Sequence, residues 1–187
     1  MEFVIKNKTD KTKYELAQAM KDLMKSREIE KISVSDICDG AMVSRPTFYK
    51  YFRDKYDLVN WYFDKVATNS FLQMGTSMTL REALTRKYII MQEEGSFFPV
   101  AFRSHSQNNL MEYDYNSIYD FYCGYIADKT GHKITGDMEF ILKVYCAGSI
   151  HMTVEWAVSG MTTPPEEMAD LLIRSLPEEL KRILPVD

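Results

Sequence analysis

The chain has 187 residues, of which 45% are hydrophobic and 27% are charged. This composition is ordinary for a globular protein and excludes an intrinsically disordered chain. The formal net charge of −4 excludes a protein that attracts polyanions through its overall charge. The length allows one sizeable domain, or a small domain fused to a medium one.

Charge is distributed unevenly along the chain. Residues 1–62 contain 12 Lys and Arg against 10 Asp and Glu, a balance of +2, and residues 63–187 contain 11 against 17, a balance of −6. A mildly basic first third on an acidic remainder favours a small nucleic-acid-binding unit carried by a larger body.

The cysteines and the terminal segments indicate a compartment. Cys38, Cys123 and Cys146 lie far apart, without CxxC or Cys/His spacing, which predicts three buried thiols in a reducing cytoplasm and no metal site. The start is polar after five residues, and no apolar run approaches the roughly 20 residues of a membrane helix. We therefore expect a soluble, cytoplasmic protein without a membrane partner.

Helical periodicity dominates, and no alternating strand pattern persists, so the sequence predicts an all-α fold. Ser33 with Asp36 is a plausible helix start, Asp54 caps a further helix, and Thr163 with Pro164 at the first helical position opens a late one. The predicted helices span about residues 10–26, 33–40, 44–52, 54–66, 80–94, 110–129, 136–159 and 164–176, with a short bent segment at 96–104.

The stretch from Ser33 to Leu58 contains two short helices joined by a tight turn and braced by a first helix, which is the geometry of a helix-turn-helix. Phe48 and Phe52 supply a thin inward-facing apolar edge. The same helix carries donors for phosphates and base edges, namely Arg45, Thr47, Tyr49, Lys50 and Tyr51. The alternative is an ordinary helical corner whose polar face is merely solvated.

This run resembles the DNA-binding domain of TetR/AcrR-family regulators, whose pattern is approximately T-V-x-x-I-A-x-x-A-G-V-S-x-G-T-L-Y-x-H-F-x-x-K-x-x-L. The matching positions are Ser33, Val34, Ile37, Ala41, Val43, Ser44, Thr47, Phe48, Tyr49, Phe52, Lys55 and Leu58. The resemblance implies a three-helix helix-turn-helix DNA-binding domain at residues 1–58. It also implies a continuous helical effector-binding and dimerisation domain at residues 59–187.

The resemblance also implies roles for single residues. Thr47, Tyr49 and Lys55 would hold the phosphate backbone, with Lys55 the strongest candidate. The residues expected at the groove are Arg45, Pro46, Lys50 and Tyr51, and Ser33 and Ser44 complete the expected DNA-binding set.

Three positions depart from the family pattern. Met42 replaces the turn glycine, so either Gly40, two residues earlier, shifts the strain, or Met42 adopts the left-handed backbone at a cost near 1 kcal/mol. Pro46 replaces a small residue and disfavours helical geometry at Arg45, so we expect Arg45 to cap the recognition helix and the helix to begin one residue late. Tyr51 stands where the family often has histidine.

In the body, two helices carry apolar stripes that would build a four-helix dimer interface. The alternative is that both stripes belong to the monomer's own core. The stripe residues are Phe140, Val144, Cys146, Ala147, His151, Val154 and Val158 on one helix, and Met168, Leu171, Leu172 and Leu176 on the next.

Aromatic residues crowd the segment from Phe97 to Tyr125, and such a cluster either lines a ligand cavity or packs a core. The ligand-binding candidates are Phe98, Phe102, Tyr119, Tyr122 and His151. Residues 31–61, together with the late segment 154–172, are also similar to regulators of dihydroxyacetone kinase operons, which implies a small polar metabolite or a partner protein as effector. No catalytic motif and no cofactor pattern appears, so we expect no enzyme.

The sequence thus predicts a homodimeric transcription regulator that binds a double-stranded DNA operator under the control of an effector. The rival interpretation is a TetR-like protein-interaction or co-regulator module that has lost sequence-specific DNA binding. Met42, Pro46 and the weak +2 balance favour the rival, whereas Tyr49 and Lys55 favour the regulator.

Overall fold

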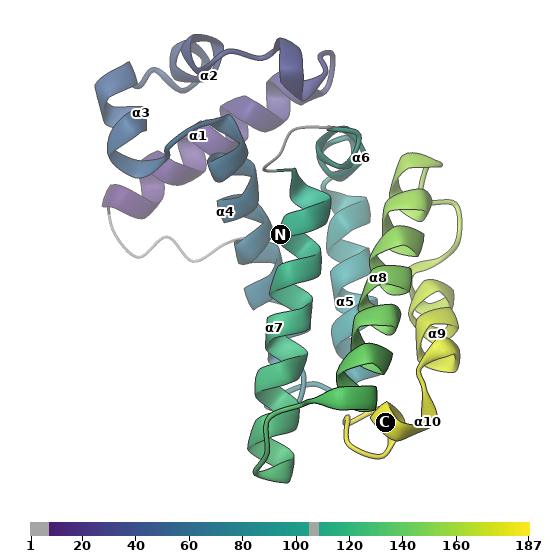
Figure 1. Cartoon of the computed structure of the whole chain (residues 1–187). Coiled ribbons are helices and arrows are strands. Elements are labelled where there is room, and N and C mark those ends of the chain that lie inside the picture. The colour runs from purple at the N-terminus through teal and green to yellow at the C-terminus, as the bar shows by residue number, and fades with distance from the viewer. Residues whose placement is uncertain (1–7, 105–108) are drawn as a thin grey trace.

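The computed structural model describes residues 8–104 and 109–187, and these are helical throughout apart from turns and connections (Figure 1). The prediction of an all-α fold is confirmed. The helices are α1 (Lys8–Met24), η1 (Ile29–Lys31), α2 (Val34–Ala41), α3 (Arg45–Tyr51), α4 (Lys55–Thr68), η2 (Phe71–Gln73), α5 (Leu80–Glu93), α6 (Phe97–Phe102), α7 (Leu110–Thr130), α8 (Gly136–Val158), α9 (Pro165–Ser175) and α10 (Glu178–Lys181).

Helices α1, α2 and α3 form an N-terminal unit at one end of the molecule (Figure 1). Helix α1 packs mainly on α2, and α2 on α3. Leu16 and Met20 from α1, Ile37 from α2 and Phe48 from α3 are all fully buried in the resulting core. Because each helix buries only one apolar edge, its other faces stay in solvent.

Helix α4 joins the N-terminal unit to the body, by which we mean α5 to α10. Asp54 caps its start, because the Asp54 carboxylate accepts hydrogen bonds from the backbone N–H groups of Tyr56 and Asp57, both at 2.8 Å. The helix then continues without interruption to Thr68. A boundary between residues 58 and 59 therefore falls inside one continuous helix, and the two parts share α4.

The body consists mainly of long helices that run side by side, α5 against α9 and α7 against α8, with α6 lying across one end (Figure 1). Buried aromatic and aliphatic side chains fill the space between these helices. Trp156 packs edge-on against Tyr88 and its indole N–H donates to the Thr163 carbonyl at 2.9 Å. It serves as the packing anchor between α5 and α8.

The start of α9 differs from the sequence prediction. Thr163 is not the cap and Pro164 is not the first helical residue; Pro164 itself is the N-cap, with an extended ψ of 145°, and α9 begins at Pro165 without a side-chain cap. The physical reason is the next proline, since a residue that precedes proline is sterically driven from helical to extended geometry.

Buried polar contacts connect the N-terminal unit to the body. The Lys21 ammonium of α1 donates to the Tyr62 hydroxyl of α4 at 3.1 Å and pairs with the Glu94 carboxylate at the end of α5. Burial raises the pKa of Tyr62 far above its ordinary value, and the nearby Glu94 carboxylate raises it further. Loss of one partner would leave a buried charge uncompensated, so this cluster fixes where the unit sits.

The cysteines lie largely as expected, with one difference. Cys38 and Cys146 are buried, but Cys123 is only half-buried on α7, so the prediction of three buried thiols is wrong at that position. Within the described ranges, no helix is both long and apolar enough to cross a membrane.

Candidate nucleic-acid interface

The turn between α2 and α3 is built by local backbone chemistry. Ser33 and Asp36 form a reciprocal capping box, in which the Ser33 hydroxyl accepts from the Asp36 N–H at 3.1 Å and the Asp36 carboxylate accepts from the Ser33 N–H at 2.8 Å. The helix ends at Met42, whose φ of 54° is left-handed. The expectation that this position needs the backbone conformation of glycine is therefore confirmed.

The recognition helix begins differently from the prediction. Ser44 is the N-cap, and its hydroxyl accepts from the Thr47 N–H at 3.3 Å. Arg45 is the first helical residue, not the cap, because proline is well tolerated in a first turn where its missing N–H has no intrahelical partner. The Ser44 and Thr47 hydroxyls also lie 2.8 Å apart in a hydrogen bond, so Thr47 already has a partner within the turn.

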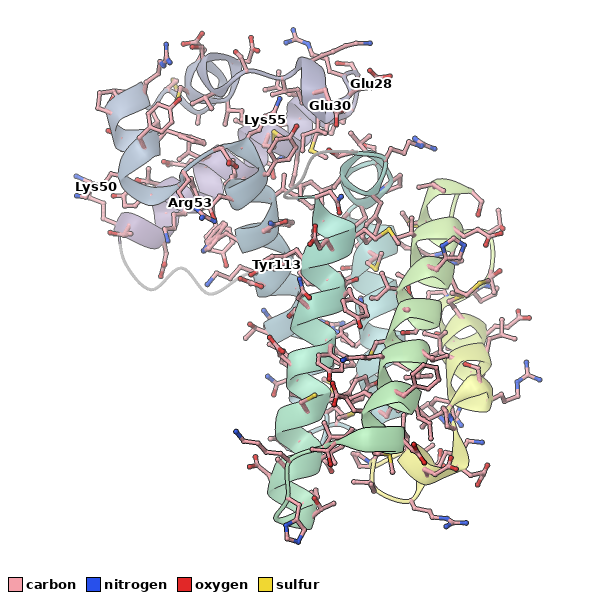
Figure 2. All side chains as sticks on the ribbon, viewed as in Figure 1. Glu28, Glu30, Lys50, Arg53, Lys55 and Tyr113 are labelled. Carbon is pink, nitrogen blue, oxygen red and sulfur yellow. The ribbon has the colours of Figure 1, made fainter. Side chains whose placement is uncertain are left out.

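Helix α3 divides cleanly between core and solvent. Phe48 and the following Phe52 are 0% and 3% exposed, as predicted. The outer face carries exposed Arg45, Pro46, Tyr49 and Lys50, with Thr47 and Tyr51 partly exposed. Figure 2 shows Lys50 pointing away from the rest of the molecule at the far end of the N-terminal unit. The structure thus brings together every predicted groove residue on one short exposed helix.

Lys55 lies at the start of α4, and its side chain bonds within the protein. Its ammonium donates three hydrogen bonds to backbone carbonyls, to Ile29 at 2.6 Å, Glu30 at 3.0 Å and Ile32 at 2.7 Å. A lysine ammonium has three N–H donors, so this network uses all of them. The prediction of Lys55 as the strongest phosphate ligand is not supported by this geometry: the residue fastens η1 to the start of α4.

Two basic side chains near α3 escaped the sequence analysis. The Lys13 ammonium of α1 lies 5.5 to 5.8 Å from the ring centroids of Tyr51, Phe52 and Trp61, within cation–π range. Arg53 follows α3, is 86% exposed and pairs loosely with Asp57 at 3.6 Å. Only the tertiary packing of α1 against α3 and α4 reveals Lys13, because its ring partners are about 40 residues away in sequence.

The predicted ligand residues do not converge on a cavity. Phe98, Phe102 and Tyr122 are 0%, 5% and 1% exposed and pack in the core, whereas His151 is exposed on α8 and Tyr119 lies half-exposed on α7. The five candidates therefore do not face one shared cavity in this structure, and their role in ligand binding stays a prediction. The reason is that the aromatic rings pack edge-to-face against one another and fill the space.

The interior of the body holds a buried ion pair. Lys87 on α5 and Asp114 on α7 are almost fully buried, with the ammonium 3.0 Å from one carboxylate oxygen. Burial raises the pKa of Asp114, and the adjacent Lys87 opposes that rise. The space next to the pair, bordered also by Tyr88 and Tyr122, measures only about 10 Å³, about enough for one water molecule.

Exposed apolar side chains mark one surface of the body. Phe140, Val144 and Met152 on α8 are 70%, 57% and 47% exposed, and Leu171 on the neighbouring α9 is 42% exposed. We call these four residues the α8–α9 face. A soluble monomer rarely leaves such large apolar groups together in water unless they form an interface.

The two predicted stripes divide between this face and the monomer core. Phe140, Val144, Ala147, His151 and Leu171 point outward. The stripe residues buried in the monomer's own fold are Cys146, Met168, Leu172 and Leu176, and Val154 and Val158 are partly buried.

Comparison with known proteins agrees with this architecture. A family model described as bacterial regulatory proteins of the tetR family matches residues 13–61, and a model of a transcriptional regulator C-terminal region matches residues 78–178, more than half of the chain. The chain belongs to the TetR family. As a TetR-family protein it is a transcriptional regulator and not an enzyme, as predicted.

Individual relatives refine the comparison. DhaS of Lactococcus lactis subsp. lactis, an HTH-type dhaKLM operon transcriptional activator, is 47% identical over 49 residues, or 26% of this chain and 26% of DhaS. That match spans about a quarter of the relative's length. The solved structure of a dihydroxyacetone kinase operon activator DhaS is 25% identical, with a TM-score of 0.64 over 92% of this chain and 98% of that one.

Further solved structures share the fold at lower identity. A TetR-family regulator from Syntrophomonas wolfei superposes with a TM-score of 0.61 at 16% identity, covering 96% of this chain and 100% of that one. A TetR regulator from Streptococcus agalactiae gives 0.58 at 19%, covering 94% and 95%. TetR regulators bind DNA operators, typically as dimers. In the described part of this TetR regulator, no group of His, Cys, Asp and Glu side chains is arranged to hold a metal ion.

Proposed function

We propose that this TetR regulator binds its operator as a homodimer, with α3 in the major groove. The observation that carries the proposal is the division of α3, whose Phe48 and Phe52 edge is buried while its polar face is left in solvent. Arg45 and Lys50 then reach base edges, and Tyr49, with Lys13 and Arg53, reaches phosphates. The N-terminus of α3 adds backbone N–H groups for a phosphate.

Dimerisation through the α8–α9 face supports this mode of binding. Two copies related by a twofold axis would bury Phe140, Val144, Met152 and Leu171 and leave both N-terminal units free. A dimeric helix-turn-helix protein contacts two half-sites about 34–36 Å apart. We therefore assign residues 1–58 to DNA binding and residues 59–187 to dimerisation and effector response, with α4 shared between them.

The similarity to DhaS supports a related target. We propose that this TetR regulator controls a dihydroxyacetone kinase operon, and that an effector, either a small molecule or a partner protein, changes the position of its N-terminal units. The effector acts through the contacts that join these units to the body, among them the buried Lys21, Tyr62 and Glu94 cluster. The coupling free energy of this effector equals the difference between its binding free energies for the two positions of the N-terminal units.

One observation favours the rival interpretation of a co-regulator that no longer reads DNA. Lys55 and the Thr47 hydroxyl, two of the three expected phosphate donors, are already bonded within the protein. The rival predicts an apolar protein interface whose affinity changes little with salt, whereas a phosphate-binding dimer weakens steeply as salt rises.

Fluorescence anisotropy distinguishes the two. Purified protein is titrated onto duplexes from its own upstream intergenic DNA and onto a scrambled duplex, at several salt concentrations. We expect binding to the upstream DNA that weakens with salt, loss of affinity in Lys50→Ala, and no change in Lys181→Ala, which lies on α10. Equal, weak binding to both duplexes would favour the rival.

A further inference from the structure

A large groove lies where the N-terminal unit meets the body. The end of α1 and η1 form one wall, α6 forms the other, and the space between them is about 910 Å³. Figure 2 shows Glu28 and Glu30 at the edge of the N-terminal unit, near the end of the molecule that α6 covers. This volume is in the range of small-molecule sites, whereas the space beside the Lys87–Asp114 pair measures only about 10 Å³.

The floor of the groove is apolar. Met24 at the end of α1 is 1% exposed, and half-buried Tyr56 and Val100 line the groove beside it. Such a surface gains free energy by covering an apolar ligand group, because water is displaced from it.

The charged groups on the rim differ in how far their side chains are already bonded within the protein. Both lining acids are engaged, Glu28 with Lys31 at 2.8 Å and Glu30 as acceptor from the Ser104 hydroxyl at 2.7 Å. Arg103, at the end of α6, donates to the Val158 carbonyl at 2.9 Å, and in the described ranges no carboxylate pairs with it. A guanidinium has five donors, so Arg103 retains several for a ligand.

Two further lining cations increase the positive charge. Lys25 and Arg27 stand on the opposite wall, with their side chains 67% and 48% exposed, and their partners are the carboxylates of Asp22 and of Asp36. The Arg27 pair is loose, at 3.6 Å. Of the three lining cations, Arg103 is therefore the one that no carboxylate pairs with in the described residues.

We propose that this groove binds a small organic anion with an apolar body, as the effector site of the regulator. Arg103 holds the anionic group, and the ligand's apolar part lies on Met24, Tyr56 and Val100. The proposal rests on the effector control proposed above and assigns its site.

The position of the groove explains how ligand binding there would affect the DNA-binding helices. One wall belongs to the N-terminal unit and the other to the body, and the Glu30–Ser104 hydrogen bond spans the two. A ligand that contacts both walls binds with an affinity that depends on their separation. Binding therefore shifts the population of N-terminal unit positions, and DNA in turn shifts ligand affinity by the same factor.

The test uses the fluorescent amphiphilic anion anilinonaphthalene sulfonate (ANS) on the full chain. We expect one saturable site per chain by fluorescence titration. Arg103→Gln should weaken the affinity about tenfold, the usual effect of losing a charge-assisted hydrogen bond, and Val100→Trp, which fills the groove, should abolish binding. Arg174→Gln on α9 is the matched control and should bind ANS as the parent chain does. Thermal melting of each variant verifies folding.

Equal ANS affinity in all four proteins would overturn the site. Because ANS also adsorbs to exposed apolar surfaces, a signal lost in Phe140→Ser but not in Val100→Trp would locate it on the α8–α9 face and likewise refute the groove.

Fluorescence anisotropy with operator DNA distinguishes the effector site proposed here from the DNA-binding function proposed above. Saturating ANS should change operator affinity by about fivefold or more. An unchanged affinity with ANS bound in the groove would refute the effector role while DNA binding stands. Absence of operator binding without ANS would refute the proposed function, and the titration alone would still decide whether the groove binds the anion.

Discussion

Replacing Lys55 tests whether this residue holds the protein together or holds DNA. Its ammonium bonds the carbonyls of Ile29, Glu30 and Ile32 at 2.6 to 3.0 Å. Lys55→Met keeps most of the apolar stem and removes all three donors. The carbonyls of Ile29 and Glu30 in η1, and of Ile32 directly after it, then lose their charged partner.

The expected loss follows from these contacts. A hydrogen bond to a charged group contributes about 1.5–3 kcal/mol, but Lys55 is only half-buried, so water replaces part of what is lost. We expect the free energy of unfolding to fall by about 3 kcal/mol. For a chain of this length this lowers Tm by about 6–12 °C, measured by circular dichroism on heating.

DNA binding provides the second readout. Lys50→Met on α3 is the matched control, since Lys50 is exposed and its ammonium packs 5.7 Å from the Tyr51 ring centroid. It should melt like the parent chain, weaken operator binding by about 1–3 kcal/mol with relaxed base specificity, and leave the slope of log K against log salt nearly unchanged. If Lys55→Met instead left Tm unchanged and reduced that slope, our reassignment of Lys55 would be wrong.

Three further changes probe other parts of the structure. Lys87→Met should lower the free energy of unfolding, measured with guanidinium, by about 3–5 kcal/mol because Asp114 stays buried without its partner. The double variant with Asp114→Leu as well should recover most of that loss. Equal losses in the single and the double variant would contradict the ion-pair argument. Met42→Gly should raise the free energy of unfolding by about 1 kcal/mol, since the 93% exposed side chain packs little and its φ is 54°; a loss of stability would refute the strain. With the thiol reagent DTNB, Cys123 should react first in the native protein. Cys146 should react only on unfolding, because burial raises the pKa of its thiol to about 12. Labelling of both cysteines at the same time would contradict the packing described above.

The helices of this protein follow from its sequence because their signals are local. Apolar spacing located α1, α5, α7 and α8 to within a few residues. The Ser33 and Asp54 caps were also predictable, since a capping side chain bonds backbone N–H groups within its own first turn. Local reasoning failed where two prolines adjoin: it recognised a helix start near Pro164 but missed the effect of Pro165.

The groups that the polar side chains contact could be identified only from the tertiary structure. Lys55 finds acceptors 23 to 26 residues earlier in the chain, and no helical period relates such positions. The same holds for Lys87, whose partner Asp114 lies 27 residues further on.

The aromatic residues of the body show most clearly the difference between what the sequence predicts and what the tertiary structure decides. Its sequence has aromatic residues at helical spacing, which is compatible with a lined cavity and with a packed core. Phe98 and Tyr122 are in the core because rings from other helices pack edge-to-face against each of them, Phe63 of α4 against Phe98, and Phe71 of η2 and Tyr145 of α8 against Tyr122. The sequence by itself determined the family, the helices and the exposed face of α3. Packing between distant segments decided which side chains remain free to bind a ligand, because burial depends on neighbours that sequence spacing does not record.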